Sequence, residues 1–338
     1  DNPRDENPKM IRATIKKNIN KSKLYEIPNR AEAIKRAIFE LKTGDILVIA
    51  GKGHENTQEY GKFRKLFSDY KEIKKIIKIK NKTLSSNLKL NILIELSNSE
   101  RLSAKLKIKN ASINSKKIKM NDIFFAIKGK NKDGNLFIKE AFKNGASLVV
   151  TDKLKNNKKQ IKTKDTLKFL TEASSVLREN NASIIIAITG SSGKTSLKEL
   201  IGKSLNKISN TTYSPNSFNN KFGVPLSLFN LKKNDDYGIF EVAMDKKGEI
   251  DFLSNIIKPD VAVITNISYA HIKNFKNIRE IALAKSEIIQ NIKKSGYLVL
   301  NADDSFFDLH KKIALKRKLN ILSFSTKHKS SNIFLNSI

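Results

Sequence analysis

The chain has 338 residues, 39% of them hydrophobic, which is too long for one ordinary core and predicts two or three domains. It contains no cysteine, which excludes disulfides and thiolate metal sites, and no apolar run approaches the roughly 20 residues of a membrane span, so we expect no membrane insertion. The net charge of +32 suggests an anionic partner. However, only nine of the 65 basic residues are arginine, the better binder of phosphate, and the lysines are spread along the whole chain. We therefore attribute the charge to biased composition and expect no specific nucleic-acid partner.

Residues 1–75 are predicted to form a small α/β unit. The segment "RAEAIKRAIFELK" (30–42) has apolar residues at helical spacing, and "DILVIAG" (45–51) is typical of a short buried strand that ends at a glycine. A basic and polar stretch with paired serines follows, and we place a linker at 76–87.

Residues 88–165 are predicted to form a second small domain. "NDIFFAIKG" (121–129) is typical of a strand, and "NLFIKEAFKNGASLVVTD" (135–152) predicts a helix, a stop at Gly145 and a strand.

Residues 166–338 alternate between apolar strands and amphipathic helices. The strands are predicted at 183–189, 237–244, 260–267, 296–301 and 320–325, and the helices at 196–208 and 278–292. The first of these helices has five apolar residues that we expect on one face: Leu197, Leu200, Ile201, Leu205 and Ile208. This alternation predicts a mainly parallel sheet covered on both faces. The predicted fold class is thus α/β, with a central sheet domain flanked by two smaller α/β domains.

The stretch "ITGSSGKTSLKEL" (188–200) stands between a predicted strand and a predicted helix. The general phosphate-binding loop, G-x-x-x-x-G-K-[ST], needs a glycine at position 188, where this chain has Ile188. A shorter G-x-x-G-K-T remains at 190–195 and makes the central domain P-loop-type. Backbone N–H groups ahead of a helix can surround an anion, Lys194 would reach terminal phosphates, and the Thr195 hydroxyl would bind Mg²⁺.

This loop is the predicted ATP site. Its residues are Gly190, Ser191, Ser192, Gly193, Lys194, Thr195 and Ser196. The alternative is a tight strand–helix turn in which the glycines serve only a steric purpose.

Other candidates follow the ends of predicted strands, where an α/β sheet places its site. They are Glu241, His271, Asn301 and Asp303. Taken singly, each is also compatible with a structural role, and their shared placement favours a site. Lys285, in "ALAKSEI", has the surroundings of an ordinary surface lysine.

Six motifs, in this order, resemble the Mur ligase family: "ITGSSGKTSLKEL", "NSFNNKFGVPLSL", "EVAMDKKGEI", "TNISYAHIKNF", "IALAKSEII" and "LNADD". The segment "SINSKKIKMNDIFFAIKGKNKDGNLFIKEAFKNGASLVV" resembles the family's N-terminal domain. Together they cover roughly residues 88–338 and look most like the members that add D-alanyl-D-alanine. Residues 1–75 resemble instead the C-terminal domain of the members that add meso-diaminopimelate, through "DNPRDENP", "IPNRAEAIKRAI", "DILVIAGKGHENTQ" and "FSD".

The resemblance implies an ATP-dependent amide ligase of peptidoglycan precursor synthesis in the bacterial cytoplasm. ATP and Mg²⁺ are its implied cofactors, and UDP-MurNAc-peptide and D-Ala-D-Ala are its implied small-molecule partners. ATP phosphorylates the terminal carboxylate of the muramoyl peptide, and an amine then attacks the acyl phosphate. The implied domains are 1–75 (C-terminal type), 88–165 (N-terminal UDP-substrate type) and 166–338 (central ATP-binding type), with no C-terminal acceptor domain after the central one.

The resemblance also implies roles for single residues. The catalytic and metal-binding residues would be Lys194, Thr195, Glu241, His271 and, if carbamylated, Lys285. Asn301 would lie on the adenine side, and Asn219 and Asn220 near the terminal phosphate and the substrate.

The two smaller domains carry implied substrate residues. The family usually has Asp-Ser-Arg where this chain has Asn114, Ser115 and Lys116, and lysine lacks the two-pronged donor of arginine. Ser115 and Lys116 remain the predicted UDP-substrate residues. In the first segment, the residues that match the diaminopimelate pocket are Asn2, Arg4, Gly51 and Glu55, where Arg4 would pair with a carboxylate and Glu55 with an ammonium group.

Several functions stay open at this point: the D-Ala-D-Ala ligase, a diaminopimelate-adding ligase, a folylpolyglutamate-type ligase, and a non-catalytic nucleotide-binding fragment. "NSFNNKFGVP" and "FFAIKG" argue against the folylpolyglutamate type. A nucleic-acid-binding module would show clustered arginine with interleaved aromatic residues, which this sequence lacks. We expect the sequence to be a fragment, truncated at both ends relative to the family, and leave open whether it comes from a natural fusion.

Overall fold

In the computed structural model, the chain forms two compact units, Asp1–Asn87 and Leu88–Ile338. The described residues are 5–17, 19, 24–41, 45–52, 55–97, 102, 106–129, 132–153, 159–269 and 272–336. Across these ranges, no helix is both long enough and apolar enough to cross a membrane. The division between the units falls within helix α3 (Asp69–Ser97), so the segment 76–87, expected to be a linker, has a helical backbone.

The first unit contains helices α1 (Pro8–Lys17) and α2 (Arg30–Glu40), the antiparallel hairpin β1 (Thr57–Tyr60) and β2 (Phe63–Leu66), and most of α3. The helix predicted at 30–42 is confirmed as α2. It begins where the Asn29 side chain accepts a hydrogen bond from the Glu32 backbone N–H at 3.1 Å, a common N-cap arrangement.

The segment 45–51 is not a strand, so this prediction was wrong. Its side chains alternate as a strand's would: Leu47 and Ile49 pack against the small core of this unit, while Ile46 and Val48 are 89% and 80% exposed. No strand in the described part of the chain pairs with it. The apolar run therefore predicted neither the exposure of alternate residues nor the absence, among the described residues, of the partner strand that a sheet requires.

The second unit contains a four-stranded and a seven-stranded sheet, and every strand pair in both is parallel. The smaller sheet has the order β3 (Ala111–Ser112), β4 (Ile123–Phe125), β5 (Leu148–Thr151) and β6 (Gln160–Lys162). Helix α4 (Ile138–Lys143) packs on one face and α5 (Thr166–Glu179) on the other. The predicted helix–Gly145–strand segment is confirmed, with Gly145 at φ +105°, where glycine is favoured.

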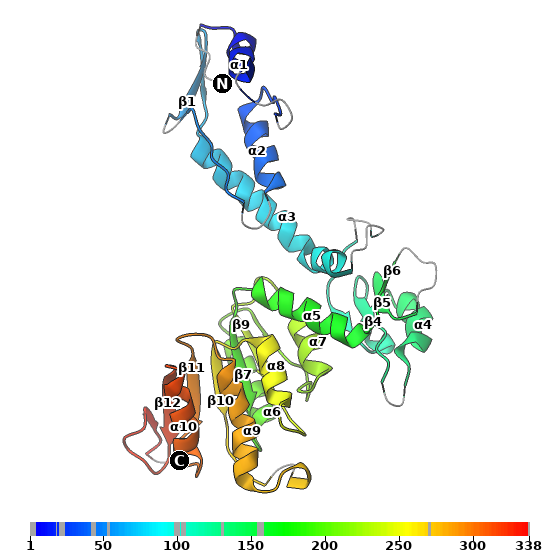
Figure 1. Cartoon of the computed structure of the whole chain (residues 1–338), viewed down its shortest axis with the longest axis vertical. Helices are drawn as coiled ribbons and strands as arrows, with labels where there is room; N and C mark the ends of the chain where they lie inside the picture. Colours follow the sequence, from blue (N-terminus) through cyan, green and yellow to red (C-terminus); the bar gives the residue numbers. More distant parts are fainter. Residues whose placement is uncertain are drawn as a thin grey trace. The chain divides into compact units, whose positions relative to one another are not determined.

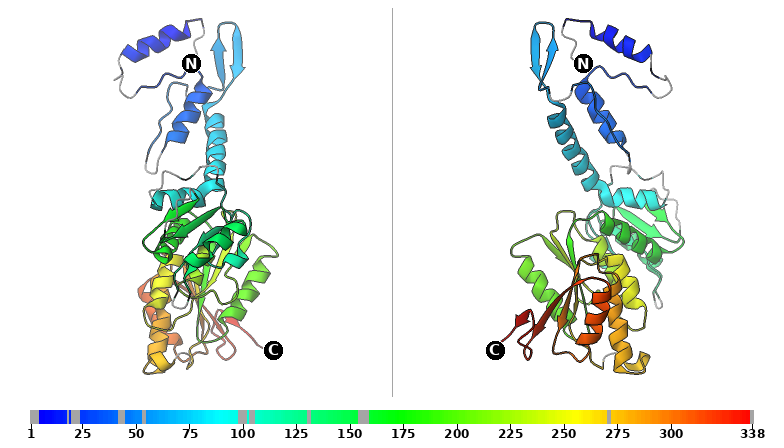
Figure 2. Two further views of the ribbon diagram at one scale, coloured as in Figure 1. Left: turned by 90° about the vertical axis from the view of Figure 1, so that its right-hand side faces the viewer. Right: turned by 60° about the vertical axis from the view of Figure 1, so that its left-hand side comes forward.

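The larger sheet has its strands in the order β13 (Ile333–Phe334), β12 (Asn320–Ser325), β11 (Tyr297–Asn301), β10 (Val261–Ile264), β7 (Ile184–Thr189), β9 (Tyr237–Glu241) and β8 (Thr211–Tyr213). All five strands predicted for residues 166–338 are present. Helices cover both faces of this sheet, so the predicted α/β fold class is confirmed (Figures 1 and 2).

The covering helices follow the alternation of side chains along each strand. Ile186 and Ile188 of β7 pack with α6 (Lys194–Leu205), and Ile185 and Ala187 belong to the core formed with α8 (Glu249–Ile257), α9 (Ile278–Gln290) and α10 (Phe307–Lys316). Helix α7 (Gly223–Phe229) contributes to this second core and contacts the smaller sheet, where the Phe229 and Phe125 rings meet edge to face at 5.6 Å.

Helix α6 corrects part of the predicted apolar face. Leu197, Ile201 and Leu205 pack on the sheet, but Leu200 and Ile208 are exposed. Leu200 is turned about 100° around the helix from Ile201, and Ile208 lies beyond the end of the helix.

The strand order reverses beside β7. From β7 the chain passes to β8 at the sheet edge, returns through β9, and then crosses to β10 on the other side of β7. The carboxyl ends of β7, β9 and β10 therefore border the crevice in which α/β sheets bind ligands.

Candidate functional site

The loop 190–193 joins β7 to α6 at this crevice. It is held by the residues that follow β10: the Ser191 N–H donates to the Asn266 carbonyl at 2.9 Å, and the Thr265 hydroxyl donates to the Ser192 carbonyl at 2.6 Å. A Cβ atom at Gly190 would lie 1.9 Å from the Thr265 hydroxyl oxygen. This close approach requires glycine, so the loop has a defined shape with its backbone ahead of a helix N-terminus.

Glu241 lies at the end of β9 and is 1% exposed. One carboxylate oxygen accepts a hydrogen bond from the Thr195 hydroxyl at 2.8 Å, and the other accepts one from the Asn219 side-chain amide at 2.7 Å. Both donors are neutral, and none of the ion pairs between described residues involves Glu241. A buried carboxylate with neutral partners, next to a hydroxyl, has the hard oxygen donors that a divalent cation prefers.

Two lysines converge on the carbonyl of Gly190. Lys194 Nζ and Lys285 Nζ each donate to this oxygen at 2.9 Å. Burial, together with the nearby charge of Lys194, lowers the pKa of Lys285 to about 7. Burial also lowers the pKa of Lys194, against the opposing effect of Glu241. Lys285 is thus no surface lysine: it is buried and in direct contact with the loop.

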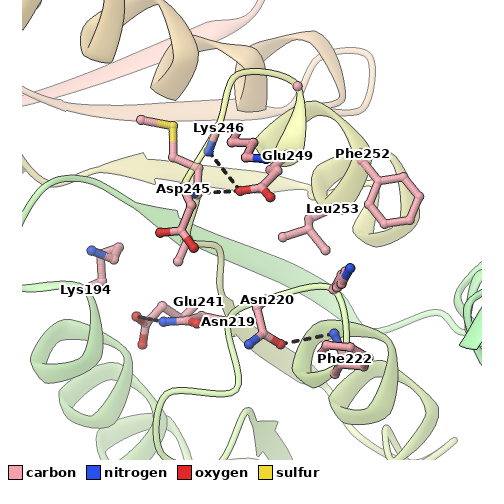
Figure 3. A pocket seen from close by; sticks show the side chains of 14 residues that line it. Lys194, Asn219, Asn220, Phe222, Glu241, Asp245, Lys246, Glu249, Phe252 and Leu253 are labelled. Atoms are coloured by element: carbon pink, nitrogen blue, oxygen red, sulfur yellow. Dashed lines mark hydrogen bonds between the residues drawn. The ribbon is translucent and has the colours of Figure 1, made fainter. Parts of the chain in front are cut away.

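A cavity of about 670 Å³ opens beside Lys194 and Glu241 (Figure 3). Asn219 and Asn220 lie on one side of it, and Asp245, Lys246, Phe252 and Leu253 on the other. Of the two asparagines, Asn219 contacts Glu241 directly through its side-chain amide. The Asn220 side chain instead accepts from the Phe222 and Gly223 N–H groups, at 3.1 and 3.0 Å, and caps the start of α7.

Two carboxylates that the sequence analysis did not select hold the far wall of this cavity. Glu249 accepts from the Asp245 and Lys246 N–H groups at 2.6 and 3.1 Å. Glu287 of α9 accepts from the Gly248 N–H at 2.8 Å and the Asp251 N–H at 3.1 Å. Glu287 lies two residues after Lys285, so α9 contacts both the loop and this wall; its place beside Lys285 was the only sequence signal for it.

A second, larger cavity of about 1,130 Å³ lies between the smaller sheet and the segment from β8 to α7. Four lysines line it: Lys116, Lys117, Lys119 and Lys132. Ser115 also lines it, but its hydroxyl donates to the Glu140 carboxylate, a partner that sequence analysis missed. Lys116 is exposed, with its backbone N–H held by the Asn114 side chain at 3.0 Å.

Asn301 is the last residue of β11 and Asp303 follows it, but neither lines the cavity beside Lys194. The Asn301 side chain accepts from the Asp303 N–H at 3.0 Å. The Asp303 carboxylate accepts from the Ser325 hydroxyl and from the Thr326 N–H at 2.8 Å, and these hydrogen bonds hold its pKa at about 2. Asp303 therefore has a structural role in joining the ends of β11 and β12.

Of the remaining predicted site residues, some lie in the described part of the chain and others do not. Ser196 is exposed in the first turn of α6. Gly51 (φ +100°) and Glu55 lie in one loop of the first unit, where Lys52 Nζ donates to the Glu55 carbonyl at 2.7 Å. His271, Asn2 and Arg4 lie outside the described residues.

Two family models match this chain. The model of the Mur ligase family catalytic domain matches residues 107–189, and the model of the Mur ligase middle domain matches residues 188–338. Among curated proteins, the UDP-N-acetylmuramoyl-tripeptide–D-alanyl-D-alanine ligase of Buchnera aphidicola subsp. Baizongia pistaciae is 36% identical over 236 residues, which are 69% of this chain and 51% of the relative. The chain thus spans about half the length of the curated relatives it matches.

Solved structures give the same family. MurF from Acinetobacter baumannii is similar with a TM-score of 0.64 and 30% identity, over 73% of this chain and 55% of that one. The MurF ligase from Thermotoga maritima, solved in complex with ADP, is similar with a TM-score of 0.57 and 32% identity, over 65% of this chain and 51% of that one.

Proposed function

We propose that this chain, which belongs to the Mur ligase family, acts in the ATP-dependent joining of D-Ala-D-Ala to UDP-MurNAc-tripeptide. The observation that carries the proposal is the buried Glu241, bonded to Thr195 and Asn219 beside the loop lysine Lys194, in a chain whose relatives bear this ligase's name. In the reaction, the γ-phosphoryl group of ATP moves to the terminal carboxylate of the tripeptide. The amine of D-Ala-D-Ala then forms the amide, loses a proton and releases phosphate.

The loop residues are proposed to hold the phosphates of ATP. The support is the geometry of Gly190 and Gly193, both with positive φ, which lets the backbone approach a ligand closely ahead of α6. Lys194 supplies positive charge next to this backbone. The related Thermotoga maritima ligase was solved with ADP, which supports a nucleotide as ligand.

Thr195 and Glu241, together with Lys285 once it is carbamylated, are proposed to hold Mg²⁺, and Asn219 orients the Glu241 carboxylate. The oxygen donors of Thr195 and Glu241, and the buried charge of Glu241 without an ionic partner among the described residues, fit this ion. When bound, Mg²⁺ would supply positive charge against the phosphate oxygens. The role proposed for His271 rests on the family resemblance alone.

The larger cavity is proposed to receive the UDP-MurNAc part of the substrate. Its volume of about 1,130 Å³ and its four lysines suit a large, anionic ligand. In this proposal, Ser115 holds the wall of the larger cavity in place through its hydrogen bond to Glu140, and the exposed Lys116 supplies positive charge to the ligand. The diaminopimelate-type pocket at Gly51 and Glu55 stays a prediction for the first unit. Since ATP and UDP-linked precursors are cytoplasmic metabolites, we also propose a cytoplasmic location in bacteria.

Lys285 is proposed to be carbamylated. A neutral amine is the form that attacks CO₂, and a pKa of about 7 makes this form available near neutral pH. We expect protein equilibrated with ¹³C-bicarbonate at pH 8 to show a carbamate carbonyl signal by ¹³C NMR. The signal should decrease below pH 7, where the amine is protonated, and be absent in Lys285→Met. A signal that survives this substitution would place the carbamate on another lysine.

Calorimetric titration tests the proposed function against its rivals. The chain should bind Mg-ATP and UDP-MurNAc-tripeptide, and bind dihydrofolate and mixed-sequence DNA far more weakly at physiological salt. Any DNA binding should be steeply salt-dependent, as expected for a lysine-rich surface. Binding of dihydrofolate in preference to the muramoyl peptide would support the folylpolyglutamate-type ligase instead.

A further inference from the structure

Lys198 of α6 is a charged residue that the proposed chemistry leaves unexplained. It lies one helical turn after Lys194, and its side chain is 0% exposed. Its Nζ donates to the backbone carbonyl of Asn216 at 2.5 Å and lies 3.2 Å from a Glu199 carboxylate oxygen. A buried ammonium is unfavourable unless acceptors surround it, so these two partners are what keep Lys198 in this position.

The segment 214–220, which Lys198 contacts, borders both cavities. Pro215, Asn216 and Phe218 line the larger cavity, whereas Asn219 and Asn220 line the cavity beside Lys194. We call residues 214–220 the dividing segment.

The conformation of the dividing segment is constrained at several points. Asn216 has φ +48°, a left-handed conformation that costs free energy for a residue other than glycine. The Ser214 N–H donates to the Ile239 carbonyl at 3.0 Å, and the Asn219 amide holds Glu241. The Lys198 ammonium holds the carbonyl of the one residue in the unfavourable conformation.

Helix α6 contacts the chain just before the dividing segment as well. A Cβ atom at Gly202 would lie 2.6 Å from the Tyr213 ring, so helix and strand β8 are in close contact there. Lys198 and Gly202 are four residues apart and therefore on one face of α6. Helix α6 carries Lys194 and Thr195 in its first turn. Through the face that carries Lys198 and Gly202, it also supports a wall of the larger cavity.

We propose that Lys198 is a positioning residue that fixes the dividing segment, and thereby sets the affinity of the larger cavity for its anionic UDP-linked ligand. The conformational part of this inference follows from the contacts of Lys198 alone. The part that names the ligand rests on the proposed function. Lys198 acts through the Asn216 carbonyl and is expected to touch neither nucleotide nor muramoyl substrate.

The test compares Lys198→Met with the parent chain. Methionine has a similar length but neither charge nor donor, so the Asn216 carbonyl and Glu199 lose their partner and thermal stability should fall modestly. Amide hydrogen exchange should become on the order of 10-fold faster within residues 214–220, since a hydrogen bond from a charged group is lost. In calorimetry, UDP-MurNAc-tripeptide should bind on the order of 10-fold more weakly, whereas Mg-ADP should bind as it does to the parent.

Lys203→Met is the matched control, because Lys203 lies on the same helix and also pairs with Glu199, but is exposed. It should change neither the exchange of residues 214–220 nor either affinity. Lys198→Gln, which keeps an N–H donor, should give an intermediate exchange rate and provides a second variant if Lys198→Met does not fold.

Unchanged exchange at 214–220 in both Lys198 variants would overturn the proposal, as would faster exchange spread over the whole chain. Faster exchange at 214–220 with an unchanged affinity for UDP-MurNAc-tripeptide would overturn it too. If the parent chain binds neither ligand while the exchange difference appears, the positioning role is supported and the proposed function is the part that fails.

Discussion

Lys194→Ala should lower the rate of ATP turnover in the presence of UDP-MurNAc-tripeptide by on the order of 100- to 1,000-fold, the loss typical when one preorganised donor to developing charge is removed. Lys194 is half-buried, donates to the Gly190 and Ser191 carbonyls at 2.9 and 3.3 Å, and lies in the wall of the cavity that contains Glu241. Its ammonium group therefore lies where the loop meets the cavity, which is where we propose that the phosphates bind. The measurement is ADP release under saturating substrate.

Lys203→Ala, an exposed substitution about two and a half turns further along α6, is the control and should leave the rate unchanged. Equal Mg-ATP affinity and equal turnover in Lys194→Ala and the parent would contradict the phosphate-binding role of the loop.

Glu241→Gln should raise the Mg²⁺ concentration that half-saturates turnover by at least about 100-fold. Loss of a residue that only supports a metal ligand costs up to about 100-fold in metal affinity, and loss of a ligand itself should cost no less. Glutamine keeps the shape of Glu241 but removes the only charge that we identified for the ion among Thr195, Asn219 and Glu241. The fold should tolerate the change, because a buried charge with neutral partners is removed, and thermal stability should be equal or higher. Turnover is measured as a function of Mg²⁺ concentration.

The matched control is Glu249→Gln, at a carboxylate that only accepts backbone N–H groups at the opposite wall of the same cavity. It should leave the Mg²⁺ dependence as in the parent. A shift of similar size in both variants would mean that the effect comes from the cavity shape rather than from a metal site at Glu241.

Five of the seven strands of the larger sheet could be predicted because their signals are local, whereas the short strands β8 and β13 were not predicted. β7, the loop 190–193 and α6 follow one another within a short stretch, and the apolar strands are bounded by recognisable helices. The strand expected at 45–51 does not form. Its local sequence gave no information about a partner strand, which must come from elsewhere in the chain.

The contacts of the site could be predicted only in part, because they join residues distant in sequence. Asn219 and Glu241 are 22 residues apart, and Lys285 and Gly190 are 95 apart. Strand ends pointed to Glu241, but no periodic pattern distinguishes the buried Lys198 from its exposed neighbour Lys203. Which lysine is buried depends on how α6 packs against β8 and the dividing segment, and that packing is decided by tertiary structure.

Transfer of oxygen-18 tests the central proposal most directly. UDP-MurNAc-tripeptide labelled with ¹⁸O in its terminal carboxylate is incubated with the chain, an added C-terminal domain of a D-Ala-D-Ala-adding ligase, Mg-ATP and D-Ala-D-Ala, and the phosphate and peptide products are analysed by mass spectrometry. If the carboxylate is phosphorylated before the amine attacks, each amide formed should leave one ¹⁸O atom in the released phosphate, alongside UDP-MurNAc-pentapeptide. Pentapeptide formed with unlabelled phosphate, or ATP turnover that is independent of the labelled substrate, would contradict the account.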